Sequence, residues 1–317
     1  MIWIVTGKQA KPILKTKARD VVLIFQGWFF YFRRVFDWSI RMKIDKIINN
    51  NVVSALEDNG NEIVVMGKGI GFHTKKGMEI PERQIEKVFR LDNPGTMDQF
   101  KSLLENLPLE HLQASTEIIN YAKSVLNRKI NQSIYITLTD HINFAIERYR
   151  QKMMFTNPLL REVKTFYKEE YLVGEYAIAL IERRIGISLP VDEAASIALH
   201  IVNAEYNTKM RDTIDITNLI QAVLGIVKEE FKMELDETSL NYERFITHLR
   251  FLAQRIYSKE LLGTDDNQEF YDMVAKMYPE ECACSRKVAA YIYDTYRHKV
   301  SDEEVSYLAV HIKRVRM

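Results

Sequence analysis

The feature that most constrains the fold is an internal repeat in the second half of the chain. The segment AIALIERRIGISLPVDEAASIALHI aligns without a gap over VAAYIYDTYRHKVSDEEVSYLAVHI when His200 is placed on His311. In the same register Glu193 falls on Glu304, and apolar residues recur at the spacing of amphipathic helices. A repeat of this kind indicates two homologous helical domains.

A second pair of segments lengthens the repeat. DHINFAIER aligns over THLRFLAQR, and the matched residues are His141 and His248, Phe144 and Phe251, and Arg148 and Arg255. The two histidines are 59 residues apart in the first copy and 63 in the second, a difference of about one helical turn. We therefore expect helical domains at residues 97–208 and 209–317, with a capping box from Ser301 and Glu304 at the last helix.

Residues 42–95 have the pattern of a small sheet. KIDKIINNNVVSALED alternates apolar and polar residues and indicates a first strand, NGNE a turn, IVVMGKGIGF a second strand, and EIPERQIEKVFRL a third. Because so short a segment buries little core by itself, we expect it to dimerise or to pack on a neighbour. The predicted fold class is α+β multidomain, a small antiparallel β-sheet domain followed by two homologous all-α helical-bundle domains.

Residues 1–41 differ from the rest of the chain. They hold eight Lys/Arg and two Asp/Glu, a net charge of +6, whereas the whole chain has +1. Their apolar run DVVLIFQGWFFYF has 13 residues, fewer than the roughly 20 of a membrane-spanning helix, and no signal-peptide cleavage site follows it. We expect Met42 to be the natural start and residues 1–41 to be an extension, with an amphipathic membrane anchor as the alternative.

The net charge limits which partners are expected, and the cysteine content indicates the cellular compartment. Residues 42–317 carry a net charge of −5, so bulk charge does not mark the main body as a nucleic-acid binder. Cys282 and Cys284 are two residues apart, a spacing that rarely forms a disulfide, and no paired cysteine cluster completes a metal site. We expect a cytoplasmic protein without stable membrane insertion.

Histidines that recur in register suggest a shared role. A metal site would need three or four ligands, and each copy offers two histidines, with an adjacent acid, Asp140, in the first copy only. A catalytic base would need a nucleophile or a substrate motif, and no GxSxG, P-loop, HExxH or kinase pattern is present. Phosphorylation of the imidazole is the third alternative, because phosphate adds charge and strong acceptors that switch an interface. His73, His111 and His298 show no pairing and are treated as ordinary.

Longer segments of the chain resemble a known family. MKIDKIINNNVVSALEDNGNEIVVMGKGIGFHTKKGMEIPERQIEKVF resembles the N-terminal RNA-binding domain of the BglG/SacY-type transcriptional antiterminators. SIYITLTDHINFAIER, SLPVDEAASIALHIVNAE, RFITHLRFLAQR and LAVHIKRV resemble the histidine-bearing segments of their two phosphotransferase-system regulation domains. The resemblance covers residues 42–317 and is nearest to the β-glucoside branch.

The resemblance implies a function. A homodimer of the N-terminal domain would bind an mRNA hairpin that overlaps a terminator, so that RNA polymerase continues. A sugar-specific enzyme II permease would inhibit through the first regulatory domain, and the phosphocarrier HPr would activate through the second. The phosphorylated residues would be His141, His200, His248 and His311, with Asp140 orienting a histidine of its own or a partner subunit. The family is not enzymatic, so we expect no cofactor, no metal and no DNA partner.

The resemblance also implies which residues contact RNA: Lys46, Asn51, Gly67, Lys68, Gly69 and Phe72. Asn51 would pair with base edges, Phe72 would stack on an unpaired base, and the lysines would reach phosphate or a base. The position of Lys68 is often Arg in the family, so the bidentate geometry is lost here. From the residues alone, Asn51 is also a turn former and Phe72 is also a candidate for dimer core.

Two other functions are compatible with the repeat. A DNA-binding activator would need a helix-turn-helix, and the segment before the repeats has strand patterns instead. A phosphocarrier of the phosphotransferase system would need rapid onward transfer of its phosphoryl group.

Overall fold

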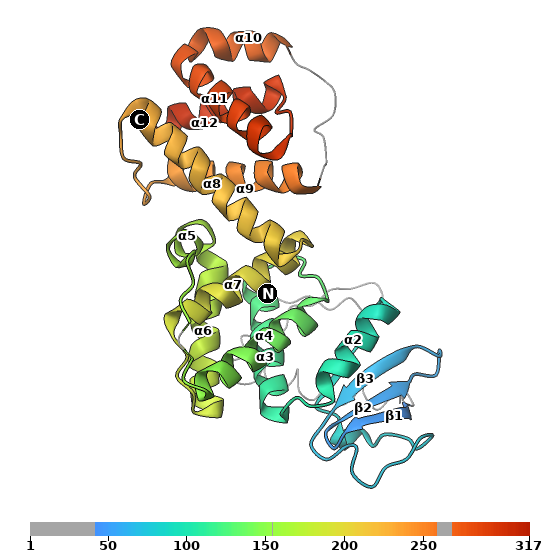
Figure 1. Cartoon of the computed structure of the whole chain (residues 1–317). Helices are drawn as coiled ribbons and strands as arrows, with labels where there is room; N and C mark the ends of the chain where they lie inside the picture. Colours follow the sequence, from blue (N-terminus) through green and yellow to red (C-terminus); the bar gives the residue numbers. More distant parts are fainter. Residues whose placement is uncertain (1–41, 154, 259–267) are drawn as a thin grey trace, which may run out of the picture. The chain divides into compact units, whose positions relative to one another are not determined.

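The computed structural model describes residues 42–153, 155–258 and 268–317. The chain divides into two compact units, one ending at Arg90 and the other spanning Leu91–Met317 (Figure 1). The expectations for residues 1–41 lie outside the described residues.

The first unit contains an antiparallel sheet, as predicted. Its strands are β1 (Lys43–Asn49), β2 (Val52–Leu56), β3 (Glu62–Met66) and β4 (Lys87–Phe89), and each pairs with the next in chain order. The expectation of one strand through KIDKIINNNVVSALED is wrong, because Asn50 and Asn51 form a turn between β1 and β2. Asparagine favours such turns, since its short side chain bonds nearby backbone.

Alternation along the strands places one set of apolar side chains inside the small unit. Its core is made of Ile44, Val53, Ala55, Ile63, Val65, Ile70 and Ile80. The third expected strand is mostly replaced by a 3₁₀ turn, η1 (Glu82–Gln84), and only β4 remains of it. Pro81 starts this turn, because it cannot donate to a strand ladder.

The second unit is helical in all its described secondary structure, as predicted. The helices before the repeat boundary are α2 (Pro94–Leu104), α3 (Leu109–Val125), α4 (Ile134–Arg150), α5 (Leu160–Phe166), α6 (Lys168–Ile185) and α7 (Val191–Tyr206). Those that follow are α8 (Met210–Phe231), α9 (Leu240–Ser258), α10 (Gln268–Met277), α11 (Pro279–Tyr296) and α12 (Asp302–Val315). Asn93 caps α2 by accepting from the amides of Gly95 and Thr96.

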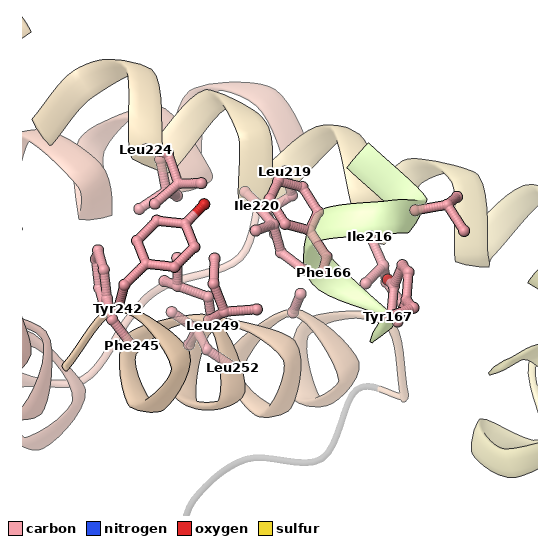
Figure 2. Packing of buried hydrophobic residues seen from close by; sticks show 14 of the residues in the cluster. Phe166, Tyr167, Ile216, Leu219, Ile220, Leu224, Tyr242, Phe245, Leu249 and Leu252 are labelled. Carbon is pink, nitrogen blue, oxygen red and sulfur yellow. The ribbon is translucent and has the colours of Figure 1, made fainter. Parts of the chain in front are cut away.

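Helix α8 packs against helices on both sides of the repeat boundary. Ile216 and Ile220 of α8 share one buried cluster with Tyr167, just after α5, and with Phe245 of α9 (Figure 2). This cluster therefore extends from α5 through α9 and into α11 and α12. Over residues 42–153, 155–258 and 268–317, no helix is long and apolar enough to cross a membrane.

Candidate functional site

The turn between β1 and β2 is tied to the loop after β3. The Oδ1 atom of Asn51 accepts the backbone N–H of Gly69 at 2.9 Å. The Asn51 carbonyl accepts the N–H of Gly67 at 2.9 Å, and the Asn50 carbonyl accepts the N–H of Gly71 at 3.0 Å. Asn51 therefore organises the loop, which leaves its side-chain NH₂ as the group suited to donate to a ligand.

Each glycine of this loop stands where a larger residue would clash or would adopt an unfavourable backbone conformation. A Cβ on Gly67 would lie 1.8 Å from the carbonyl oxygen of Gln84, and one on Gly71 would lie 2.2 Å from that of Asn49. Gly69 has a φ of +70°, which favours glycine. Gly67 is thus needed for packing within the domain itself. A Cβ on Gly69 would meet nothing within 4 Å, so space does not require a glycine there.

Three of the predicted RNA-contact side chains lie on the surface of the small unit. Phe72 is 60% exposed, and its ring meets that of His73 edge-on, with centroids 4.1 Å apart. Lys46 on β1 and Lys68 in the loop are also exposed. An exposed aromatic ring in a glycine-rich loop, on a domain that also exposes lysines, is a feature that single-stranded bases can stack on.

The first pair of recurring histidines is brought together between α4 and α7. The rings of His141 and His200 lie 4.6 Å apart between centroids. The Nε2 atom of His141 is 3.2 Å from a carboxylate oxygen of Glu193, and the other oxygen of that carboxylate accepts from Arg148. Glu193 is 1% exposed, so the carboxylate is fixed between the two.

The second pair repeats this geometry between α9 and α12. The rings of His248 and His311 stack with centroids 4.8 Å apart. The Nε2 atom of His248 lies 3.7 Å from Glu304, whose other oxygen accepts from Arg255. An open groove of about 480 Å³ borders this pair and is lined by Leu240, Glu243, Arg244, Thr247 and Phe251.

Burial keeps three of these histidines neutral. It lowers the pKa of His200 to about 3, and the neighbouring His141 acts in the same direction. It lowers the pKa of His248 to about 3, with further contributions from His311 and Arg255. Burial also lowers the pKa of His311, helped by Arg314 and Arg244. A neutral imidazole keeps a lone pair on one nitrogen, which is what a nucleophile needs.

Comparison with known proteins identifies the kinds of domain in the chain. The family model described as CAT RNA binding domain matches residues 42–98, and the PRD domain model matches residues 116–204 and 221–315. Transcription antiterminator LicT of Bacillus subtilis is 47% identical over 274 residues, 86% of this chain and 99% of the relative. The β-glucoside operon antiterminator of Dickeya chrysanthemi is 40% identical over 275 residues, 87% of this chain and 97% of the relative.

The chain belongs to this family of transcription antiterminators. Among solved structures, the crystal structure of GlcT CAT-PRDI covers 52% of this chain at 36% identity, with a TM-score of 0.47. The structure of LicT in complex with its RNA target covers 17% at 54% identity, with a TM-score of 0.16.

The family match divides the site residues between modules of the antiterminator. Lys46, Asn51, Gly67, Lys68, Gly69 and Phe72 all lie within the CAT match. His141 and His200 lie in the first PRD match, and His248 and His311 lie in the second.

The residues that hold the histidines were not predicted as such, and Glu304 was expected only in a capping box. Glu193 and Glu304, and likewise Arg148 and Arg255, recur in register across the repeat, and that recurrence was the available signal. Asp140 is exposed, and the carboxylate at His141 within the chain is that of Glu193. A role for Asp140 toward a partner subunit stays a prediction.

His111 and the expected cap at Ser301 both have partners inside the helical unit. His111 is buried and its Nδ1 bonds Asn143 at 2.7 Å. Ser301 accepts the N–H of Glu304 at 3.2 Å, as a cap should, but the Glu304 carboxylate turns to Arg255 and His248, so the reciprocal half of the expected capping box is replaced. In the described part of the chain, no cluster of three or more histidine, cysteine, aspartate or glutamate residues could hold a metal ion.

Proposed function

We propose that this antiterminator binds an mRNA hairpin that overlaps a terminator, and that sugar-dependent histidine phosphorylation controls the binding. The observation that carries the RNA part is the exposed Phe72 beside the loop that Asn51 organises. A base splayed from the hairpin would stack on Phe72 and accept from the Asn51 amide, while Lys46 and Lys68 would meet phosphate. Residues 42–93 have equal numbers of basic and acidic side chains, so this local face, doubled in a homodimer, has to supply the affinity.

The regulatory part rests on the two histidine pairs. Neutral, partly enclosed imidazoles next to a fixed carboxylate suit acceptance and retention of a phosphoryl group. The open groove at His248 and His311 offers Leu240 and Phe251, 59% and 53% exposed, as an apolar docking surface. We assign the donors as the phosphocarrier HPr for the second pair and a sugar-specific enzyme II permease for the first.

A regulator needs no substrate site of its own, so we propose no enzymatic activity, cofactor or resident metal, and a cytoplasmic location.

A DNA-binding activator is not favoured, because the small unit presents a sheet and turns where a recognition helix would be needed. A phosphocarrier would pass its phosphoryl group onward, and a chase of labelled phosphohistidine with sugar and permease would reveal it.

A gel-shift with the full chain and the hairpin upstream of its own operon tests the RNA part. Asn51→Ala and Phe72→Ala should each weaken binding by about ten- to a hundredfold, the expected loss of one stacked base or one amide contact. Leu56→Ala is the matched control, since Leu56 is 40% exposed at the opposite end of β2 from Asn51. Equal binding by all four proteins, or preference for duplex DNA of the same sequence, would contradict the proposal.

A further inference from the structure

One ring nitrogen of each paired histidine is enclosed, and the enclosed atom alternates within each pair. It is Nε2 in His141 and in His248, and Nδ1 in His200 and in His311. The alternation is the same in both domains, which share the arrangement through the repeat. A donor from outside therefore has to reach the opposite nitrogen of each ring.

In the first histidine of each pair, a carboxylate adds to the difference between the two ring nitrogens. Glu193 faces Nε2 of His141 at 3.2 Å, and Glu304 faces Nε2 of His248 at 3.7 Å. The negative charge beside Nε2 favours the tautomer with hydrogen on that nitrogen, so the lone pair remains on Nδ1. Arg148 and Arg255 hold the two carboxylates in place from the other side.

We propose that the two histidines of each pair are phosphorylated on different ring nitrogens, His141 and His248 on Nδ1 and His200 and His311 on Nε2. This assignment rests on the proposed phosphorylation of the four residues. Each domain would thus carry one 1-phosphohistidine and one 3-phosphohistidine, two isomers that differ in reactivity. Glu193 and Glu304 act as positioning residues for the first histidine of each pair.

The transfer is balanced without a further reactant. The nitrogen opposite the enclosed one forms an N–P bond with the phosphoryl group of a donor phosphohistidine, whose ring is protonated on its other nitrogen. The donor's N–P bond breaks and its electron pair returns to the donor ring, which keeps that proton and leaves as a neutral imidazole. In His141 and His248 the acceptor ring becomes a phosphoimidazolium, whose Nε2 proton faces the carboxylate and is stabilised by it.

Isomer analysis of the full chain tests the assignment. The chain is phosphorylated with phosphoenolpyruvate, enzyme I and HPr for the second domain, and with the enzyme II permease added for the first. Proteolysis at alkaline pH then separates the peptides, and isomer-specific antibodies and ³¹P NMR identify each phosphohistidine. We expect 1-phosphohistidine in the peptides of His141 and His248, and 3-phosphohistidine in those of His200 and His311. The same isomer in both members of a pair overturns the assignment, whereas no phosphohistidine in any peptide overturns the proposed regulation itself.

Two carboxylate variants test the positioning role, each serving as the control for the other. Glu193→Gln should slow phosphorylation of His141 by about tenfold, because a neutral amide stabilises the phosphoimidazolium less than a carboxylate does. The rate at His248 should be unchanged, and Glu304→Gln should show the reverse. If each variant slows both domains equally, or neither, the carboxylates do not have this role.

Discussion

At the scale of single residues, burial decides the protonation of the paired histidines. His200 and His248 have folded pKa values of about 3, against about 6.5 in an unfolded chain. The unfolded chain therefore binds more protons between these two values, and the free energy of unfolding falls as the pH drops from about 6.5 toward 3. Above about pH 7.5 both states are neutral and this contribution is constant.

This difference gives a pH-dependent prediction. At pH 5 each of these two histidines should lower the free energy of unfolding by about 2 kcal/mol relative to pH 7.5. Urea unfolding at both pH values measures it, with His248→Gln as the comparison, because that variant should lose about 2 kcal/mol less than the wild type. Identical losses in the two proteins would show that His248 titrates normally in the folded chain.

Residues at the site were predicted from the sequence to different extents. The four histidines were visible because they recur in register, and Glu193 and Glu304 recur in the same way. Which nitrogen of each ring is enclosed depends on packing of α4 against α7 and of α9 against α12, which no local pattern records. Asp140 adjoins His141 in sequence, yet adjacent helical residues point in different directions, and Glu193 takes the place beside the ring.

At the scale of elements, α7 is positioned by an unusually close approach of α6. A Cβ on Gly174 of α6 would lie 2.1 Å from the carbonyl oxygen of Ala194 in α7. That carbonyl belongs to the residue after Glu193, so the approach fixes the helix that carries both Glu193 and His200. Gly225 of α8, by contrast, has nothing within 4 Å of an added Cβ.

These two glycines form a matched pair for mutation. Gly174→Ala should destabilise the protein by about 1–3 kcal/mol through overpacking, although alanine favours a helix. Gly225→Ala should stabilise it by up to about 1 kcal/mol, because only helix propensity changes. Thermal unfolding measures both, and a stabilised Gly174→Ala variant would show that α6 and α7 are not packed this closely.

Element type was easier to predict than element boundaries. Helical periodicity indicated the helices of the regulatory domains, because long amphipathic patterns are distinctive. The β1–β2 hairpin was missed, since the apolar alternation continues on both sides of Asn50 and Asn51 with only two turn residues between. Pro94 and Gly95 also look like a linker, yet they open α2, because proline suits the first turn of a helix.

At the scale of the whole helical unit, a buried ionic network joins the two regulatory domains. Arg250 of α9 donates to Glu170 of α6 at 2.7 Å and to the hydroxyl of Tyr206 at 2.7 Å. Arg128 donates to the same carboxylate at 2.6 Å. Burial by itself would raise the pKa of Glu170, but Arg250 and Arg128 outweigh it and keep that pKa below its ordinary value.

Loss of one partner should therefore destabilise the unit strongly. Arg250→Leu should cost about 3–5 kcal/mol, because a buried carboxylate loses its main counter-ion. Arg244→Leu on the same helix is the control and should change stability by about 0.5 kcal/mol or less, since Arg244 is exposed. Chemical unfolding compares the two variants, and equal effects would mean that the network contributes no more than surface charge.

The central claim, that this chain lets transcription continue past a terminator by binding the nascent RNA, is tested most directly by single-round transcription in vitro. The template carries the leader of its own operon with the hairpin and terminator, and the full-length transcript is measured with and without the protein. We predict that wild-type protein and Leu56→Ala raise read-through, and that Phe72→Ala and Asn51→Ala do not. Equal read-through with all four proteins, or none with the wild type despite hairpin binding, would contradict the account.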